Sequence, residues 1–288
     1  MTDMKYNFSE DLKSIREILN LSQSELAEQI GVEQVTISRN EWGNTEPSAK
    51  ILESVYALAF KKKVRINKLK EMLWRDDLKK HEKLLFHGAK SEINGEIDIH
   101  KGRHNNDFGQ GFYTGESYEQ AISFVSGFAH SSVYYIRFDD TNLRCKRYEV
   151  NQEWMMTIAY YRGKLDMYRN HPTIKRLIAQ SGDCDYIIAP IADNRMFQII
   201  NAFIDGEITD EQCKHCLAAT NLGMQYIFIS ERAVSQAKIL ERCYISVNER
   251  EYYKNIRLEE AVLGDNKVKL ARRQYRGKGQ YIDDSLGE

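Results

Sequence analysis

Residues 11–43, DLKSIREILNLSQSELAEQIGVEQVTISRNEWG, hold the pattern that decides the fold of the N-terminal part of the chain. Ser22, followed by Glu25 three positions later, forms a capping box that opens a second helix. Gly31 ends that helix and a third begins around Glu33 or Gln34, so the sequence predicts a helix-turn-helix. Apolar residues recur at steps of three and four, as amphipathic helices require: Leu12, Ile15, Leu19, Leu26, Ala27, Ile30 and Val35.

The stretch LNLSQSELAEQIGVEQVTISRNEWGNTEPS, residues 19–48, resembles the DNA-binding domain of the lambda-repressor and Cro type. The resemblance covers about residues 9–70 and implies an all-α bundle, so residues 1–70 are expected to form a helix-turn-helix DNA-binding domain. The chain departs from the family pattern at Asn40, because the family usually has an aromatic or apolar residue before the glutamate. Here Trp42 follows Glu41 instead, which leaves the end of the third helix open.

Several side chains in this region have hydrogen-bonding ends that suit base edges or phosphates. The predicted DNA-binding residues are Gln23, Gln34, Thr36, Ser38 and Arg39. Residues 1–80 hold 14 Lys and Arg against 13 Asp and Glu, so non-specific affinity for DNA is expected to be weak. Binding would then need a homodimer or other contacts. A helical bundle that only mediates protein contacts is the alternative.

Composition limits the class of protein. A chain of 288 residues, 42% of them hydrophobic, can build two buried cores, and 41 Lys and Arg nearly balance 42 Asp and Glu. Five scattered cysteines and the lack of a long apolar run lead us to expect a cytoplasmic protein without a membrane partner. Cys213 and Cys216, with His215 between them, could supply two metal ligands. No second pair exists at zinc-site spacing, so no metal is expected.

The pattern changes after residue 83. Residues 71–83 are predicted to form a charged linker helix, and beyond them the runs KLLFHG, SVYYIRFD, CDYIIAP and MQYIFIS predict strands. Helical patterns lie between these runs without regular alternation, which favours an α+β domain over residues 84–250 rather than a doubly wound sheet. Residues 251–288 form a basic C-terminal tail containing KVKLARRQYRGKGQY, expected to be solvated, or alternatively to contact nucleic acid or an acidic partner.

Two segments of this second region place glycines beside a histidine and a tyrosine: LLFHGAK, residues 84–90, and FGQGFYTGESYEQAISF, residues 108–124. They resemble the catalytic domain of ADP-ribosyltransferases of the poly(ADP-ribose) polymerase and diphtheria toxin class. With Arg103 and Asp107, the pattern is also similar to a bacterial family predicted to share that fold. The resemblance covers roughly residues 84–245 and implies NAD as the substrate. The implied NAD-binding residues are His87 on a ribose hydroxyl, Gly88 on the carboxamide, Arg103 on the phosphates, Gly111 beside the ring, and Tyr113 and Phe124 stacked on nicotinamide.

The third position of the implied catalytic triad, usually a glutamate on a late strand, matches Gln225 in this chain. A glutamine can hydrogen-bond a ribose hydroxyl, but it carries no charge and cannot act as a general base. Transfer of single ADP-ribose units is therefore expected rather than elongation to a polymer. Asp107 is the candidate for holding the loop before Tyr113 together.

The resemblance thus implies an NAD-dependent mono-ADP-ribosyltransferase, which is a kind of glycosyltransferase, joined to a DNA-binding domain. The related alternative is an NAD glycohydrolase. The catalytic residues would be His87, Tyr113 and Gln225. Bacterial transferases of this kind frequently act as toxins or defence effectors, so a toxin-antitoxin role with autoregulation and an antitoxin-like protein partner is expected. The alternative is a non-catalytic transcription regulator whose second domain senses NAD, ADP-ribose or a partner protein.

Overall fold

The computed structural model describes residues 5–94, 96–219 and 223–286. The chain divides into two compact units, and neither is continuous in sequence. The first unit comprises Met1–Glu96, Ser117–Phe138 and Lys238–Ile256, and the second comprises Ile97–Glu116, Asp139–Ala237 and Arg257–Glu288. The boundaries of these units differ from those of the predicted segments 1–70, 71–83, 84–250 and 251–288, because each unit is built from three separate stretches of the chain. The four segments stay predictions.

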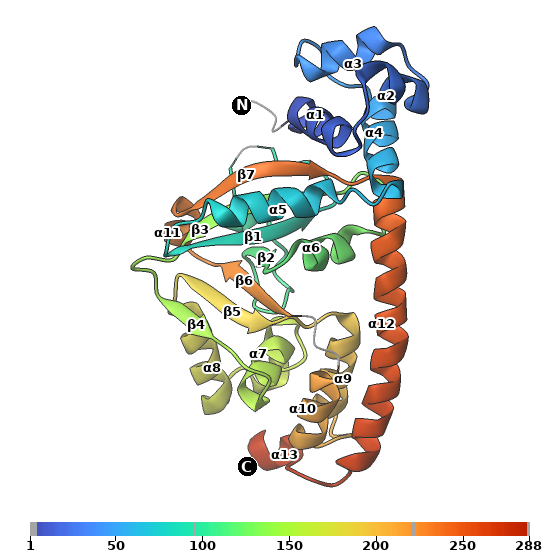
Figure 1. Ribbon diagram of the computed structural model, residues 1–288. Coiled ribbons are helices and arrows are strands. Elements are labelled where there is room, and N and C mark those ends of the chain that lie inside the picture. Colours follow the sequence, from blue (N-terminus) through green and yellow to red (C-terminus); the bar gives the residue numbers. More distant parts are fainter. Residues whose placement is uncertain (1–4, 95, 220–222, 287–288) are drawn as a thin grey trace. The chain divides into compact units, whose positions relative to one another are not determined.

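The first unit combines the N-terminal helices with three strands. Its helices are α1 (Phe8–Ile18), α2 (Gln23–Ile30), α3 (Gln34–Glu41), α4 (Ala49–Lys61), α5 (Ile66–Asp76) and α6 (Tyr118–Val125). Its strands are β1 (Glu82–Ala89), β3 (Ser132–Asp139) and β7 (Ala237–Tyr244), hydrogen-bonded in the order β1-β3-β7. The helical N-terminal region that the sequence predicts is confirmed (Figure 1).

The local signals of the helix-turn-helix are also confirmed. The Ser22 hydroxyl accepts the N–H of Glu25 at 3.2 Å, and the Glu25 carboxylate accepts the N–H of Ser22 at 2.7 Å, which completes the capping box of α2. Gly31 ends α2 with φ 70°, a conformation that glycine adopts without steric cost. Asn40 is buried, and its Nδ2 donates to the backbone carbonyl one turn earlier at 2.8 Å, so α3 continues through it and ends one residue later.

The apolar face predicted from residues 11–43 forms the core of these helices. Leu12, Ile15, Leu26 and Ile37 are completely buried and belong to one apolar cluster. Val35 differs, because 40% of its surface is exposed. The third helix therefore presents one apolar side chain to its outer surface.

A buried ion cluster joins the N-terminal helices to strand β7. Lys70 of α5 places its Nζ 2.8 Å from Asp11 Oδ2 of α1 and 2.7 Å from Glu241 Oε1 of β7. The Tyr56 hydroxyl also donates to Asp11, and Trp74 Nε1 donates to Glu241 at 3.0 Å. Helix α5 is therefore an integral part of the first unit, and it ends before the predicted linker 71–83 does.

A second buried carboxylate of the first unit lies at the start of helix α12 (Val247–Gln274). Glu249 accepts the Tyr118 hydroxyl at 2.9 Å and Asn67 Nδ2 at 3.2 Å. Burial raises the pKa of Glu249 to about 7, against the opposing effects of the Tyr118 hydrogen bond and the charge of Arg65.

The second unit is a mixed sheet with helices packed on it. Strands β4 (Cys145–Arg147), β5 (Tyr186–Pro190), β6 (Met224–Phe228) and β2 (Phe112–Gly115) are hydrogen-bonded in that order, with β4 and β5 parallel and the other two pairs antiparallel. Helices α7 (Gln152–Tyr161), α8 (Pro172–Gly182), α9 (Asn194–Ile204) and α10 (Asp210–Ala218) gather on one side of these strands (Figure 1). The short elements are η1 (Ile99–Lys101), η2 (Asp166–Tyr168), α11 (Glu231–Ser235) and α13 (Ile282–Leu286). The irregular mixture of strands and helices predicted from the sequence is confirmed.

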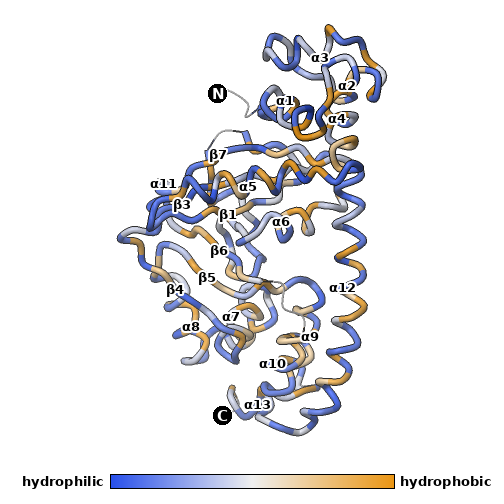
Figure 2. The backbone as a smooth tube through the Cα atoms, in the orientation of Figure 1, coloured by the Kyte–Doolittle hydropathy of each residue, from blue (hydrophilic) through white to orange (hydrophobic). Residues whose placement is uncertain are grey.

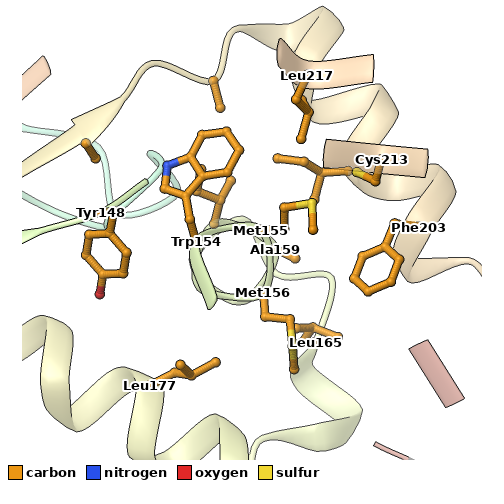
Figure 3. Packing of buried hydrophobic residues seen from close by; sticks show 14 of the residues in the cluster. Tyr148, Trp154, Met155, Met156, Ala159, Leu165, Leu177, Phe203, Cys213 and Leu217 are labelled. Atoms are coloured by element: carbon orange, nitrogen blue, oxygen red, sulfur yellow. The ribbon is translucent and has the colours of Figure 1, made fainter. Parts of the chain in front are cut away.

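The core of the second unit lies between these helices and the strands. Trp154, Met155 and Ala159 of α7 stand at its centre, as Figure 3 shows, and all three are completely buried. Ile187 of β5 and Ile227 of β6 reach the same cluster from the sheet. Because side chains alternate along a strand, this fixes which strand residues face the helices.

The C-terminal part of the chain differs from the solvated tail expected from its basic residues. Helix α12 continues through this segment to Gln274, and the short α13 follows. Ile282 and Leu286 of α13 are buried in the core of the second unit. The cations lie on a helix that is anchored beyond its end by apolar contacts.

We predict that Lys70→Met lowers the free energy of unfolding by about 3–5 kcal/mol, because Asp11 and Glu241 then remain as buried carboxylates without a cation. Urea unfolding of the full chain measures the loss. Lys61→Met, at the exposed end of α4, is the matched control and is expected to change little. Equal losses in the two variants would contradict a stabilising role for the cluster.

Glu249 predicts a pH dependence of stability. Its pKa of about 7, against an ordinary 4.5, means that the folded state holds the proton more tightly than the unfolded state. Its contribution is therefore fully present below pH 4.5 and is lost as pH rises to 7, by about 3 kcal/mol. Glu249→Gln should remove this component, so the variant gains stability over the wild type between pH 5 and 8 in urea unfolding. A constant difference across that range would count against the raised pKa.

Candidate functional site

Two of the predicted DNA-binding residues meet in the first unit through a chain of hydrogen bonds. Gln34 Nε2 donates to Gln23 Oε1 at 2.6 Å, and Gln23 Nε2 donates to Glu41 Oε2 at 2.7 Å. Arg16 holds the other oxygen of Glu41, with Nε at 2.6 Å from Oε1. The start of α2 and the start of α3 are thereby fixed to each other, as a surface that fits a rigid duplex requires.

The outer surface of α3 differs in part from the predicted one. Gln34 and Arg39 are exposed, whereas Thr36 and Ser38 are half-buried and so less available to bases. Trp42 caps α3 with 75% of its surface exposed, although the sequence pattern marked it only as a departure from the family. The Lys13 Nζ lies 6.0 Å from the centre of the Trp42 ring, which makes this exposed tryptophan a further candidate residue of the surface.

The predicted residues Tyr113 and Gln225 lie on neighbouring strands of the second unit. Gly115 of β2 pairs with Gln225 of β6, and Tyr113 pairs with Ile227. Residues that pair across two strands share a face of the sheet, and so do residues two positions apart on one strand. Ile227 faces the helices, so Tyr113 and Gln225 lie on that same face. The structure therefore brings these two predicted residues together.

Tyr113 holds the glycine-rich loop that precedes it. Its hydroxyl donates to the carbonyl of Gly109 at 2.7 Å and accepts the N–H of Phe108 at 3.1 Å. Burial, followed by the nearby charge of Asp107, raises the pKa of Tyr113 well above its usual value. The phenol stays protonated and keeps the ring in one orientation.

Gln225 holds the same loop through a carboxylate. Its Nε2 donates to Asp107 Oδ2 at 2.9 Å and to the Pro190 carbonyl at 3.2 Å. Asp107 also accepts the N–H of Ala192 at 3.2 Å and Nε of Arg162 at 2.9 Å, with a further bond from Arg162 Nη2. Asp107 thus holds the loop, as the sequence suggested, and it fixes which way the Gln225 amide points. Within the described residues, Gln225 Oε1 has no hydrogen-bond partner.

Arg162 is a member of this site that the sequence did not indicate. It caps α7, donates to the Ala192 carbonyl at 2.6 Å, and lies with its guanidinium 4.4 Å from the centre of the Phe197 ring. Nothing in the local sequence marks which of the arginines meets Asp107. Its guanidinium places a cation beside this buried carboxylate, which offsets the cost of burying it.

Close approach of backbone explains the glycines of the loop. Gly109 has φ 74°, and a Cβ there would lie 2.9 Å from the ring of Tyr161. A Cβ on Gly111 would lie 2.8 Å from the carbonyl oxygen of Phe228. The segment passes close to Tyr161 and to β6 only because neither residue has a side chain.

The remaining predicted NAD-binding residues are spread over both units. His87 and Gly88 lie half-buried on β1 and Phe124 is 38% exposed on α6, all in the first unit, whereas Arg103 is exposed in the second. A Cβ on Gly88 would lie 2.5 Å from the carbonyl oxygen of Ala121, so α6 packs against β1 only because that residue is glycine. That His87 and Tyr113 meet at one ligand stays a prediction.

The segment after β5 has a structural role. Asp193 caps α9, because its Oδ1 accepts the N–H groups of Arg195 and Met196, each at 3.0 Å. A pocket of about 350 Å³ lies beside the segment that joins β5 to α9. Its lining includes Arg147, Val150, Pro190, Ile191, Met196 and Met224. Pro190 also accepts the Gln225 amide, so the pocket adjoins the residues that hold Gln225.

Cys213 and Cys216 are core residues of α10. Both are completely buried, and their thiols donate to the carbonyls of Ile199 at 3.6 Å and Val268 at 3.7 Å. His215 stacks on Tyr275 with 3.5 Å between the ring centres. In residues 5–94, 96–219 and 223–286, no three His, Cys, Asp or Glu side chains are grouped to hold a metal ion.

Comparison with known families gives two matches. Residues 12–55 match a family model described as helix-turn-helix, so the first unit contains a DNA-binding helix-turn-helix domain of the Cro and lambda-repressor type. Residues 84–239 match the model described as Protein of unknown function (DUF3990), and because this match spans more than half of the chain, the chain belongs to that family. No curated protein and no solved structure matches it. Across the described part of the chain, no helix combines the length and apolar character needed to cross a membrane.

We predict that Arg39→Ala weakens DNA binding by about 1–3 kcal/mol, because an exposed guanidinium on the outer surface of α3 is lost. Fluorescence anisotropy with a duplex selected from a random pool measures the affinity. Arg176→Ala, an exposed arginine of α8, is the matched control. Unchanged affinity in the Arg39 variant would show that α3 does not face the duplex.

Gln225→Glu is predicted to lower the free energy of unfolding by about 1–3 kcal/mol at pH 8, because it places a second carboxylate against Asp107. Repulsion raises the pKa of the introduced carboxyl, so the destabilisation shrinks as pH falls toward 4 and that group takes up a proton. Gln198→Glu, exposed on α9, provides the control in the same unfolding experiment. A loss that does not depend on pH would refute the contact.

Proposed function

We propose that this chain is a DNA-binding regulator that cleaves NAD and transfers a single ADP-ribose unit. The transferase role is supported by the resemblance of residues 84–90 and 108–124 to ADP-ribosyltransferases, and above all by the orientation of Gln225. Asp107 and the Pro190 carbonyl both accept from Nε2. Oε1 is therefore the atom available to accept a hydrogen bond from a ribose hydroxyl.

In the proposed reaction, the bond between nicotinamide and the anomeric carbon breaks and nicotinamide leaves with the electron pair. An acceptor nucleophile then bonds to that carbon and loses its proton. His87 would bind a ribose hydroxyl, Gly88 the carboxamide through its backbone, and Tyr113 and Phe124 the nicotinamide ring. Gln225 would stabilise the growing positive charge by an amide dipole alone, which is weaker than a carboxylate. Slow transfer of one unit is the expected outcome.

Two further residues would hold the rest of the NAD molecule. Arg103, exposed in the loop of the second unit, carries a charge suited to the two phosphates. Gly111 would let the ring lie close to the backbone, because it has no side chain in the way.

The test incubates the purified full chain with NAD labelled in its adenylate part, and follows nicotinamide release together with transfer of label to protein, nucleic acid and small acceptors. His87→Ala and Tyr113→Ala should abolish both signals. Tyr113→Phe is the matched control, because it keeps the ring and removes only the hydroxyl bonds to the loop, so part of the activity should remain. Release without transfer would indicate an NAD glycohydrolase instead.

A second candidate is a non-catalytic regulator that senses NAD or ADP-ribose. The observation that favours it is the state of Asp107, whose oxygens are taken up by Arg162, Ala192 and Gln225. The Asp107 carboxylate beside Gln225 is therefore used to stabilise the fold rather than to act on a ligand. Tight binding of NAD or ADP-ribose by calorimetry without turnover would support the sensor, and absence of binding to both ligands would overturn both candidates.

The helix-turn-helix domain supports a role in controlling transcription, with the chain's own gene as the proposed target. We place the transferase among toxins or defence effectors that an antitoxin-like protein restrains. Footprinting of the DNA upstream of the gene tests the first part. Co-purification of the chain with the product of an adjacent small gene tests the second.

A further inference from the structure

From Arg257 onward, helix α12 buries its small residues within the second unit and exposes its large apolar residues. Gly264 and Ala271 are buried, whereas Leu258, Val262, Leu263 and Leu270 are between 57% and 67% exposed. At 3.6 residues per turn, these four side chains fall within a sector of about 140° on the helix. We call Leu258, Val262, Leu263 and Leu270 the outer stripe. Figure 2 shows apolar and polar segments alternating along α12.

The opposite side of α12 is already packed within the second unit. Arg195 of α9 pairs with Asp265 at 3.5 Å, Gln212 of α10 donates to the carbonyl of Arg272 at 2.6 Å, and Cys216 donates to that of Val268 at 3.7 Å. These contacts fix the rotation of the helix. The outer stripe therefore faces away from the helices α9 and α10 that hold α12.

The charges along α12 change sign near Asn266. Residues 258–265 contain Glu259, Glu260 and Asp265 and no cation, whereas residues 266–276 contain five cations and no anion. Among the described residues, Glu259 and Arg273 form no ion pair. A partner that neutralises this helix must present the same two charges in the reverse direction.

We propose that two copies of this chain pair antiparallel through the outer stripes of their α12 helices. A two-fold axis near Asn266 places Val262 and Leu263 of one copy against Leu270 of the second copy, and Glu259 against Arg273. The contact is self-complementary, as a two-fold interface requires. A polar residue such as Asn266 at the centre of an apolar seam is a common device for fixing the register of paired helices.

A second copy fits better than other occupants of the stripe. A nucleic acid would be repelled by the acidic half, and exposed leucines at the centre of the helix give it nothing to bond. Dimerisation would also double the phosphate contacts of a helix-turn-helix domain whose part of the chain is almost neutral. The proposal does not depend on whether the chain cleaves NAD.

Sedimentation equilibrium of the full chain tests the proposal. The wild type should be a dimer, and Leu263→Asp with Leu270→Asp should raise its dissociation constant by about tenfold or more. Met167→Asp is the matched control, because Met167 is an apolar side chain of the same unit with 82% exposure. Circular dichroism checks that each variant stays folded. A monomeric wild type, or a double variant that remains a dimer, would overturn the proposal.

Charge exchange tests the antiparallel direction. Glu259→Arg alone and Arg273→Glu alone should each weaken the dimer, because each sets like charges against each other twice. Both substitutions in one chain should restore it, since the pairs return with their signs exchanged. A parallel pair sets like charges against each other in the wild type and in every variant, so the single substitutions would not weaken it. That result would overturn the arrangement proposed here.

Discussion

The candidate site depends on one buried carboxylate, that of Asp107. It accepts four hydrogen bonds, from Gln225, from Ala192 and two from Arg162, and so connects the glycine-rich loop to β6, to α7 and to the turn before α9. A carboxylate is tolerated away from water only when its oxygens are filled and a cation lies beside it. Replacing any member of this set would leave the others with a charge or a polar atom to satisfy.

The loop before Tyr113 is fixed from two directions by side chains of neighbouring strands. Tyr113 bonds its backbone, and Gln225 reaches it through Asp107. Binding and catalytic groups work best when their geometry is set before the ligand arrives, because no free energy is then spent on ordering them. Tyr113 and Gln225, the predicted ligand contacts, therefore also hold the loop in place, so their variants can lose activity through lost stability.

Sequence reasoning succeeded where the cause of a feature lies within a few residues of it. Ser22 with Glu25, and Gly31 after α2, are local signals, and the structure has them as predicted. Lys70 gave no such signal, because its partners are 59 and 171 residues away in the chain. The expectation of a solvated tail is wrong for a similar reason, since the anchoring of the C-terminal segment depends on distant helices that composition does not reveal. The apolar periodicity of residues 11–43 fixed the core, but not how deeply Thr36 and Ser38 lie.

The ion cluster around Lys70 links two parts of the first unit that are far apart in the sequence. Asp11 belongs to the first helix of the DNA-binding domain and Glu241 to a strand more than 200 residues later, yet both depend on the same ammonium group. A helix-turn-helix without a carboxylate at position 11 would leave Lys70 with one of its two anionic partners. The stability of the DNA-binding helices and the packing of β7 are therefore coupled through one ammonium group.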